Sequence, residues 1–246
     1  MEGMMRWLWL PILLVLGGCS ITIPSSPPPI RASAPAGAAA LPPEIVSVKQ
    51  SVVRFSGRAP ACFKRIEGTG FVYAPQRVVT AAHVVAGVTR SFSVTTDDGE
   101  VYPARVVVFD PSVDVAVLYV PDLSAPPLVI ADAPPGDAYA LAYPKGAERE
   151  VVQPIKIERH IGAESLDIYE KRKVTKEVLE LSGANIAPGW SGAPLVVPGG
   201  TVTGMVFAQS KDAPNRGYAL AAEEFLFMVN DARYATRPVS TQQCSK

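Results

Sequence analysis

From residue 44 onward, short apolar runs alternate with turn residues such as Gly, Pro, Asp and Asn. Runs of this length at intervals of about 8–15 residues are typical of strands in an all-β sandwich or barrel. The pattern therefore predicts an all-β domain. The expected strands are 51–57, 68–74, 77–82, 91–96, 101–109, 114–120, 128–131, 137–143, 152–158, 178–183, 193–197, 201–208 and 216–222.

Three segments break this β pattern. The proline-bearing stretch 120–127 separates the first six runs from the last seven, so we expect it to cross between two halves. Residues 223–234 carry apolar positions at helical spacing and predict a C-terminal helix, whose common face holds Phe225, Met228, Val229 and Ala232. The run 170–177 alternates in charge sign and indicates a solvated hairpin.

The first 43 residues have a different pattern. An apolar run from Trp7 to Leu16 follows Arg6, and it is too short to span a bilayer as a helix but fits the core of a signal peptide. The sequence LGGC that ends at Cys19 resembles a bacterial lipobox, which implies a lipid on Cys19. Residues 20–43 are rich in Pro, Ala and Ser and predict a semi-extended tether. The alternative is a plain signal peptide, or an uncleaved anchor, with an incidental cysteine.

The resulting organisation is a signal peptide over 1–18, a lipidated cysteine and tether over 19–43, and a folded domain over 44–246 with halves at about 44–122 and 128–246. If Cys19 carries lipid, Cys62 and Cys244 remain. An even pair in an exported domain favours a disulfide, and two unpaired buried thiols are the alternative.

Charge and composition exclude several kinds of function. The 23 basic and 23 acidic residues give a formal net charge of zero, so nothing indicates a nucleic-acid partner. The chain has only two histidines and neither a CxxC nor an HExxH motif, so we expect no metal site and no cofactor. Any chemistry that requires an imidazole must use His83 or His160.

Three motifs carry the expected chemistry: His83 in RVVTAAHVVAG, Asp114 in DPSVDVAVLYV and Ser191 in PGWSGAPLVV. A serine nucleophile needs an imidazole to accept its proton and a carboxylate to orient that imidazole. It also needs N–H donors for the oxyanion, and the glycine two residues earlier lets the amides of Gly189 and Ser191 converge.

Chain order separates the classes of serine hydrolase. An α/β-hydrolase would need a histidine after Ser191, and none is present. The subtilisin order requires an aspartate before the histidine. The first aspartate in the chain is Asp97, which follows His83, so only His160 could be the histidine of this order. The residues around His160 do not form a catalytic motif. The order His83, Asp114, Ser191 is that of chymotrypsin. Asp110 is a rival for Asp114, but its Asp-Pro context favours a turn. We expect His160 at the surface or a strand edge.

TAAHVV, DVAVL and GWSGAPL resemble the three catalytic blocks of the trypsin/chymotrypsin-fold serine proteases. GTGFV, AYPKG and GYALAAEE place the resemblance in the bacterial HtrA-like branch, among actinobacterial periplasmic proteases, over roughly residues 45–245. The resemblance implies a chymotrypsin-like double β-barrel, with the triad in the cleft between the barrels. It covers the protease domain only.

The resemblance also bears on the oxyanion loop and the substrate pocket. Trp190 stands where the family usually has Asp or Asn, so we expect no activation by insertion of a new N-terminal amine. We expect the indole ring of Trp190 to pack under the loop. The bulk of this ring argues against an oxyanion hole that is already formed at rest. The family pattern places the base of the primary pocket at Asn185, which argues against strict Lys or Arg specificity. By the same pattern, the pocket wall is Phe207, Ala208 and Gln209.

Together these features predict an exported serine endopeptidase that is held at the outer face of the cell membrane by its lipid and cleaves protein or peptide substrates through an acyl-enzyme. The alternative from another class is an inert pseudoprotease that binds peptides. The physiological substrate and the oligomeric state are not readable from the sequence.

Overall fold

The computed structural model describes residues 40–183 and 185–245, and its folded unit spans Leu41–Lys246. The leader, the tether up to residue 39 and Cys19 lie outside the described residues. Among the described residues, no helix is long and apolar enough to cross a membrane.

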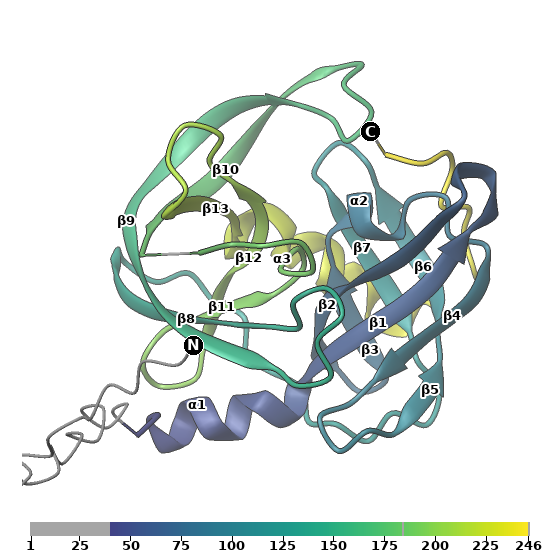
Figure 1. Ribbon diagram of the computed structural model, residues 1–246, viewed down its shortest axis with the longest axis horizontal. Helices are drawn as coiled ribbons and strands as arrows, with labels where there is room; N and C mark the ends of the chain where they lie inside the picture. Colours follow the sequence, from purple (N-terminus) through teal and green to yellow (C-terminus); the bar gives the residue numbers. More distant parts are fainter. Residues whose placement is uncertain (1–39, 184, 246) are drawn as a thin grey trace, which may run out of the picture. The chain divides into compact units, whose positions relative to one another are not determined.

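Two β-layers make up the folded unit, and Figure 1 shows them side by side, with β1–β7 in one and β8–β13 in the other. The first is a seven-stranded sheet in the order β5-β4-β1-β2-β3-β7-β6, and the second is a closed barrel in the order β10-β13-β12-β11-β8-β9. All pairings between these strands are antiparallel. The predicted double β-barrel with a C-terminal helix is confirmed.

The first layer contains β1 (Val52–Ala59), β2 (Lys64–Ala74), β3 (Arg77–Thr80), β4 (Arg90–Thr95), β5 (Val101–Pro103), β6 (Arg105–Asp110) and β7 (Val115–Tyr119). The second contains β8 (Gly136–Ala142), β9 (Val151–Leu166), β10 (Lys173–Ser182), β11 (Pro194–Val196), β12 (Val202–Gln209) and β13 (Arg216–Ala221). The helical elements are α1 (Pro43–Val48), η1 (Lys49–Ser51), η2 (Pro60–Cys62), α2 (Ala82–Val85), α3 (Ala222–Asp231) and η3 (Ala232–Tyr234).

The structure differs from the sequence-based strands at three places. The run 101–109 is two strands, β5 and β6, because the chain changes partner at Ala104: Val101–Pro103 pair with β4, whereas Arg105–Asp110 pair with β7. The run 128–131 forms only an isolated bridge from Ile130 to Val202. Strands β9 and β10 extend well beyond the predicted runs and form a long hairpin, because their outer residues also pair with each other. These outer residues expose charged side chains, so they have no apolar pattern from which a strand could be predicted.

The ends of the folded unit are also informative. Helix α1 precedes the first predicted strand and buries Ile45 and Val48 in the core. Helix α3 buries Phe225 and Val229, and Ala232 follows in η3, while Met228 is only partly buried. The tail after η3 returns to the first layer, where Val239 N donates to Val106 O and Thr241 Oγ1 donates to Val88 O.

One carboxylate lies in the core without adequate partners. The Glu150 side chain is fully buried, neither of its carboxylate oxygens has a hydrogen-bond partner among the described residues, and the Lys49 ammonium is 3.8 Å away. Burial raises the Glu150 pKa from the usual 4.5 to about 8, against the opposing attraction of Lys49. Near neutral pH the folded protein therefore holds Glu150 mainly as the neutral acid.

This buried acid predicts how stability depends on pH. Because the folded pKa lies above the unfolded one, stability falls as pH rises from about 4.5 to about 8. We expect Glu150→Gln to be more stable than wild type by about 5 kcal/mol at pH 9 and nearly equal to it at pH 4.5. Urea unfolding at both pH values measures this difference. The exposed Glu148→Gln is the control, and an equal change for both variants would contradict the prediction.

Candidate active site

The structure brings together three side chains that are far apart in the sequence. His83 comes from α2, Asp114 directly precedes β7, and Ser191 lies in the loop between β10 and β11. His83 Nδ1 is 2.8 Å from Asp114 Oδ2, and His83 Nε2 is 2.9 Å from Ser191 Oγ. With the imidazole proton on Nδ1, His83 donates to the carboxylate and accepts from the serine hydroxyl.

Backbone contacts hold Asp114 in place. Its φ of 73° is rare for a residue with a side chain, and Asp tolerates it better than most. Asp114 Oδ1 accepts the backbone N–H of His83 at 2.8 Å, and Asp114 O accepts the N–H of Ala82. The rival carboxylate, Asp110, instead caps a turn by accepting the N–H groups of Ser112 and Val113.

Burial and charge act in opposite directions on His83. Burial alone would lower its pKa, but the charge of Asp114 and the hydrogen bond to it outweigh burial, so the pKa is raised above 6.5. The ammonium of Lys176 opposes this rise. The imidazole therefore binds a proton more readily than a free histidine does.

The loop around Ser191 leaves two amides free. Within the described chain, the N–H groups of Gly189 and Ser191 donate no hydrogen bond, whereas those of Trp190, Gly192 and Ala193 do. Gly189 has a φ of 98°, which a residue with a Cβ rarely adopts. The Trp190 side chain is 3% exposed and packs in the core of the second barrel. The indole bulk therefore lies inside the barrel.

Two buried threonines of the first layer fix this loop. Thr69 Oγ1 donates to Gly189 O at 2.7 Å and accepts the N–H of Tyr143, and Thr69 N donates to Ser191 O. Thr80 Oγ1 donates to Thr69 O at 2.7 Å. The loop that holds Ser191, between β10 and β11 of the second layer, is thus hydrogen-bonded to β2 of the first layer through Thr69.

Removing the Thr69 hydroxyl tests this connection. We expect Thr69→Val, which keeps the shape but leaves Gly189 O and Tyr143 N without this partner, to lower kcat roughly 10-fold and stability by about 2 kcal/mol. Thr69→Ser retains the hydroxyl and should restore most of kcat. Steady-state kinetics and urea unfolding of the three proteins measure both effects; equal kcat in all three would contradict the assignment.

A cleft of about 270 Å³ adjoins the His83 and Ser191 side chains. Its other walls include the charged residues Lys64, Arg65, Glu67 and Lys145 and the tail residues Cys244 and Ser245. Ser245 Oγ donates to His83 O at 2.9 Å. Cys62 and Cys244 form a disulfide, as the sequence predicted, and it fastens the tail beside α2.

None of the four predicted pocket residues lines this cleft. Asn185 and Gln209 are exposed, and Phe207 and Ala208 are half-buried on β12. The sequence reasoning missed Ile186, which is 6% exposed and packs where a side chain on Gly217 would lie. Its apolar character beside Asn185 was the available signal. The primary pocket remains a prediction.

This double barrel, with a serine, histidine and aspartate hydrogen-bonded in series, defines the class of trypsin-like serine peptidases. Residues 68–205 match the trypsin-like peptidase domain family, and the chain belongs to that family. The curated relatives that match the chain, such as Rv3671c, are named serine proteases.

Two curated relatives and one solved structure illustrate the similarity. Serine protease Rv3671c of Mycobacterium tuberculosis is 40% identical over 225 residues, which cover 89% of this chain and 55% of that protein. The crystal structure of its active form has a TM-score of 0.78 and 40% identity, covering 83% of this chain and 89% of the solved one. A probable periplasmic DegP-like serine endoprotease of Chlamydia pneumoniae is 32% identical over 151 residues, 59% of this chain and 29% of that protein. This chain spans about half the length of Rv3671c.

Proposed function

We propose that this chain is a serine endopeptidase that cleaves protein or peptide substrates through an acyl-enzyme. The observation that carries the proposal is the unbroken series from Asp114 Oδ2 through His83 to Ser191 Oγ, with contacts of 2.8 and 2.9 Å. These are hydrogen-bond distances suited to proton transfer.

In the proposed reaction, Ser191 Oγ attacks the carbonyl carbon of the scissile bond while His83 Nε2 accepts the hydroxyl proton. Asp114 keeps the imidazole in the required tautomer and stabilises its cationic form. The free amides of Gly189 and Ser191 donate to the oxyanion. His83 then returns the proton to the leaving amine. In the second half of the reaction His83 accepts a proton from water, the water oxygen attacks the ester carbon, and the proton passes to Ser191 Oγ as the acid product leaves.

A fluorophosphonate probe tests this proposal directly, because it forms a covalent bond only with an activated serine. We expect the full chain to incorporate one probe molecule, located on Ser191 by peptide mass analysis, and Ser191→Ala to incorporate none. Absence of labelling between pH 5 and 9 would instead favour the inert peptide-binding alternative. The two unbonded loop amides favour the enzyme, because they leave the oxyanion site open in the free protein.

The His83 pKa predicts the acid side of the pH–rate profile. Only neutral His83 accepts the Ser191 proton, and its pKa is raised above 6.5. We expect kcat/KM to fall with decreasing pH through an apparent pKa above 6.5. Measured kcat/KM from pH 4.5 to 9 gives this value directly, and a limb centred below 6.5 would contradict it.

The side chains near Gly217 bear on the primary specificity. The apolar Ile186 side chain over Gly217, together with the uncharged Asn185, favours small or medium uncharged side chains before the cleaved bond. Phe207, Ala208 and Gln209 remain the proposed pocket wall. Cleavage of a peptide library would show this preference at the residue before the cleaved bond. Ile186→Ala should allow larger side chains at that position of the substrate. A requirement for Lys or Arg would overturn it.

We also propose export and lipid anchoring at the outer face of the membrane. The proposed organisation is a signal peptide over 1–18, a lipidated cysteine and tether over 19–43, and a protease domain over 44–246. The lipobox-like sequence before Cys19 supports this proposal, and so does the DegP-like relative, which is named as periplasmic. The mass of the mature N-terminal peptide tests it: a lipid-modified Cys19 is expected, and any other N-terminus would exclude the anchor.

A further inference from the structure

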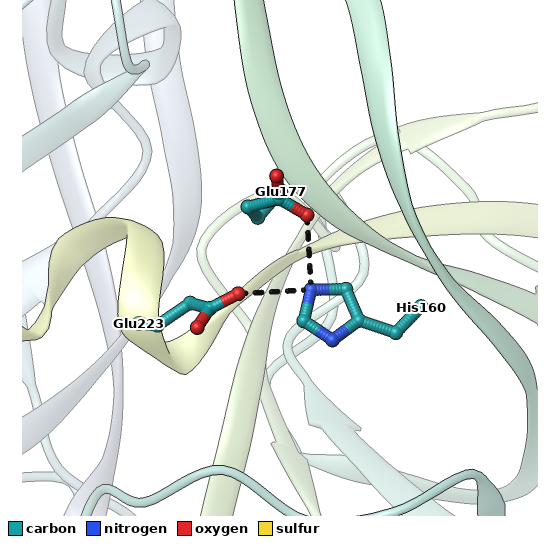
Figure 2. A group of neighbouring side chains, drawn as sticks. All are labelled: His160, Glu177 and Glu223. Atoms are coloured by element: carbon teal, nitrogen blue, oxygen red, sulfur yellow. Dashed lines mark ion pairs between the residues drawn. The ribbon is translucent and has the colours of Figure 1, made fainter.

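A second cluster of chemically capable side chains lies away from Ser191, on the second barrel. His160 on β9, Glu177 on β10 and Glu223 in the first turn of α3 converge at one point (Figure 2). Both carboxylates face the same ring atom: His160 Nε2 is 3.2 Å from Glu177 Oε2 and 3.1 Å from Glu223 Oε1. We propose that these three side chains bind a divalent transition metal of the Zn²⁺ type.

The distances between the ligand atoms match a tetrahedral metal site. Zn²⁺ binds imidazole nitrogen and carboxylate oxygen at about 2.0–2.2 Å, so two ligands of a tetrahedral ion lie about 3.4 Å apart. The two Nε2–oxygen separations are within a few tenths of an ångström of that value, and all three atoms lie within 4.8 Å of one another. A small shift of the exposed glutamate side chains would close the remaining edge.

The charge balance also favours a cation. Within the described residues neither Glu177 nor Glu223 forms an ion pair with a lysine or arginine; His160 is the partner of both. A third carboxylate, Glu224, accepts the backbone N–H of Glu177 at 2.8 Å. A neutral imidazole has one Nε2 position, which cannot satisfy two facing carboxylates. A metal ion would take the Nε2 lone pair and one oxygen from each glutamate.

The identity of the ligands indicates the class of metal. Imidazole suits Zn²⁺ and its neighbours, whereas Ca²⁺ and Mg²⁺ prefer oxygen alone. The three side chains are each about one-third to one-half exposed, so the fourth position is open to water. Since β9, β10 and α3 each supply one ligand, the bound ion would fasten the long β9–β10 hairpin to the C-terminal helix. The sequence led us to expect no metal, because the chain has only two histidines and neither a CxxC nor an HExxH motif.

Cobalt substitution tests the proposal on the full chain carrying Cys19→Ser, which removes a competing thiol. After treatment with a chelator, we expect Co²⁺ to give the visible absorption of tetrahedral coordination at one equivalent, and Zn²⁺ to displace it. His160→Gln should weaken binding by at least about 100-fold. Glu177→Gln should also weaken it. Glu164→Gln, an exposed change on the same strand, should not.

Thermal unfolding gives an independent measurement. A saturating excess of Zn²⁺ should raise Tm by roughly 5–10 °C in the parent chain and in Glu164→Gln, but not in His160→Gln. Unchanged metal binding in His160→Gln would overturn the proposal. Stabilisation by Ca²⁺ but not by Zn²⁺ would also overturn it. The proposal would fail as well if metal-free His160→Gln had a lower Tm than the parent chain while Zn²⁺ changed the Tm of neither protein, because the cluster would then be an ion pair only.

Discussion

Ser191→Ala is expected to lower kcat at least about 10⁴-fold, because no other described hydroxyl lies within hydrogen-bond distance of His83 Nε2. Asp114→Asn should have a similar effect, since an amide cannot stabilise the protonated imidazole and favours the wrong tautomer. KM should change much less than kcat in both variants. Progress curves on an unfolded protein substrate, with active-site titration of the wild type, give these values.

The matched control is Ser165→Ala. Ser165 is on β9 and its hydroxyl contacts only Leu166 O, at 3.3 Å, so its loss should leave kcat unchanged. Each variant also needs the wild-type circular dichroism spectrum and melting temperature, since Ser191 and Asp114 both form backbone hydrogen bonds that hold their loops in place. Retention of more than a hundredth of the wild-type kcat by Ser191→Ala would exclude Ser191 as the nucleophile.

Gly192→Ala is expected to lower kcat about 100-fold or more and stability by about 3 kcal/mol. A Cβ on Gly192 would overlap Thr69 O and Thr80 Oγ1, which belong to fully buried residues of the first layer. The loop would have to move away from them, and a displacement of 1 Å at a nucleophile costs about 100-fold in rate. Kinetics and urea unfolding measure the two losses.

Gly99→Ala is the control that distinguishes the effect of backbone strain from the effect of this steric overlap. Gly99 has the same φ as Gly192, 88°, but a Cβ there meets nothing within 4 Å. It should therefore cost only about 1–2 kcal/mol, the energy of the left-handed conformation, with no loss of kcat. If both variants lost activity equally, the close contact between the Ser191 loop and Thr69 would have no role in catalysis.

The sequence predicted the β architecture because burial in this fold follows period-2 patterns and Gly and Pro mark the turns. It predicted the three central residues because two histidines and their order relative to Ser191 leave few alternatives. It could not identify Thr69, because the contact of Thr69 with Gly189 spans 120 positions and no local pattern indicates it. Likewise, the apolar character of Ile186 indicates that it is buried but does not indicate that it packs against Gly217.

The His160 cluster was missed for a similar reason. Its ligands are 17 and 46 residues apart along the chain (160 to 177 and 177 to 223), and they meet only because β9 extends far beyond its apolar core and α3 begins directly after β13. The outer half of β9 exposes charged side chains, which resemble a loop when read by hydropathy. Pairing of these residues with β10 is decided by the whole hairpin, and no local pattern encodes it.

The C-terminal tail has a consequence for the timing of folding. His83 and Asp114 precede Ser191 in the chain, and Ser245, 162 positions after His83, hydrogen-bonds to the His83 carbonyl. One wall of the cleft is therefore formed by residues that are synthesised after all three side chains of the series. A nascent chain that ends soon after Ser191 lacks this wall, so the cleft is complete only once Cys244 and Ser245 have been added. Such an order of assembly would protect neighbouring nascent chains from a peptidase made in their midst.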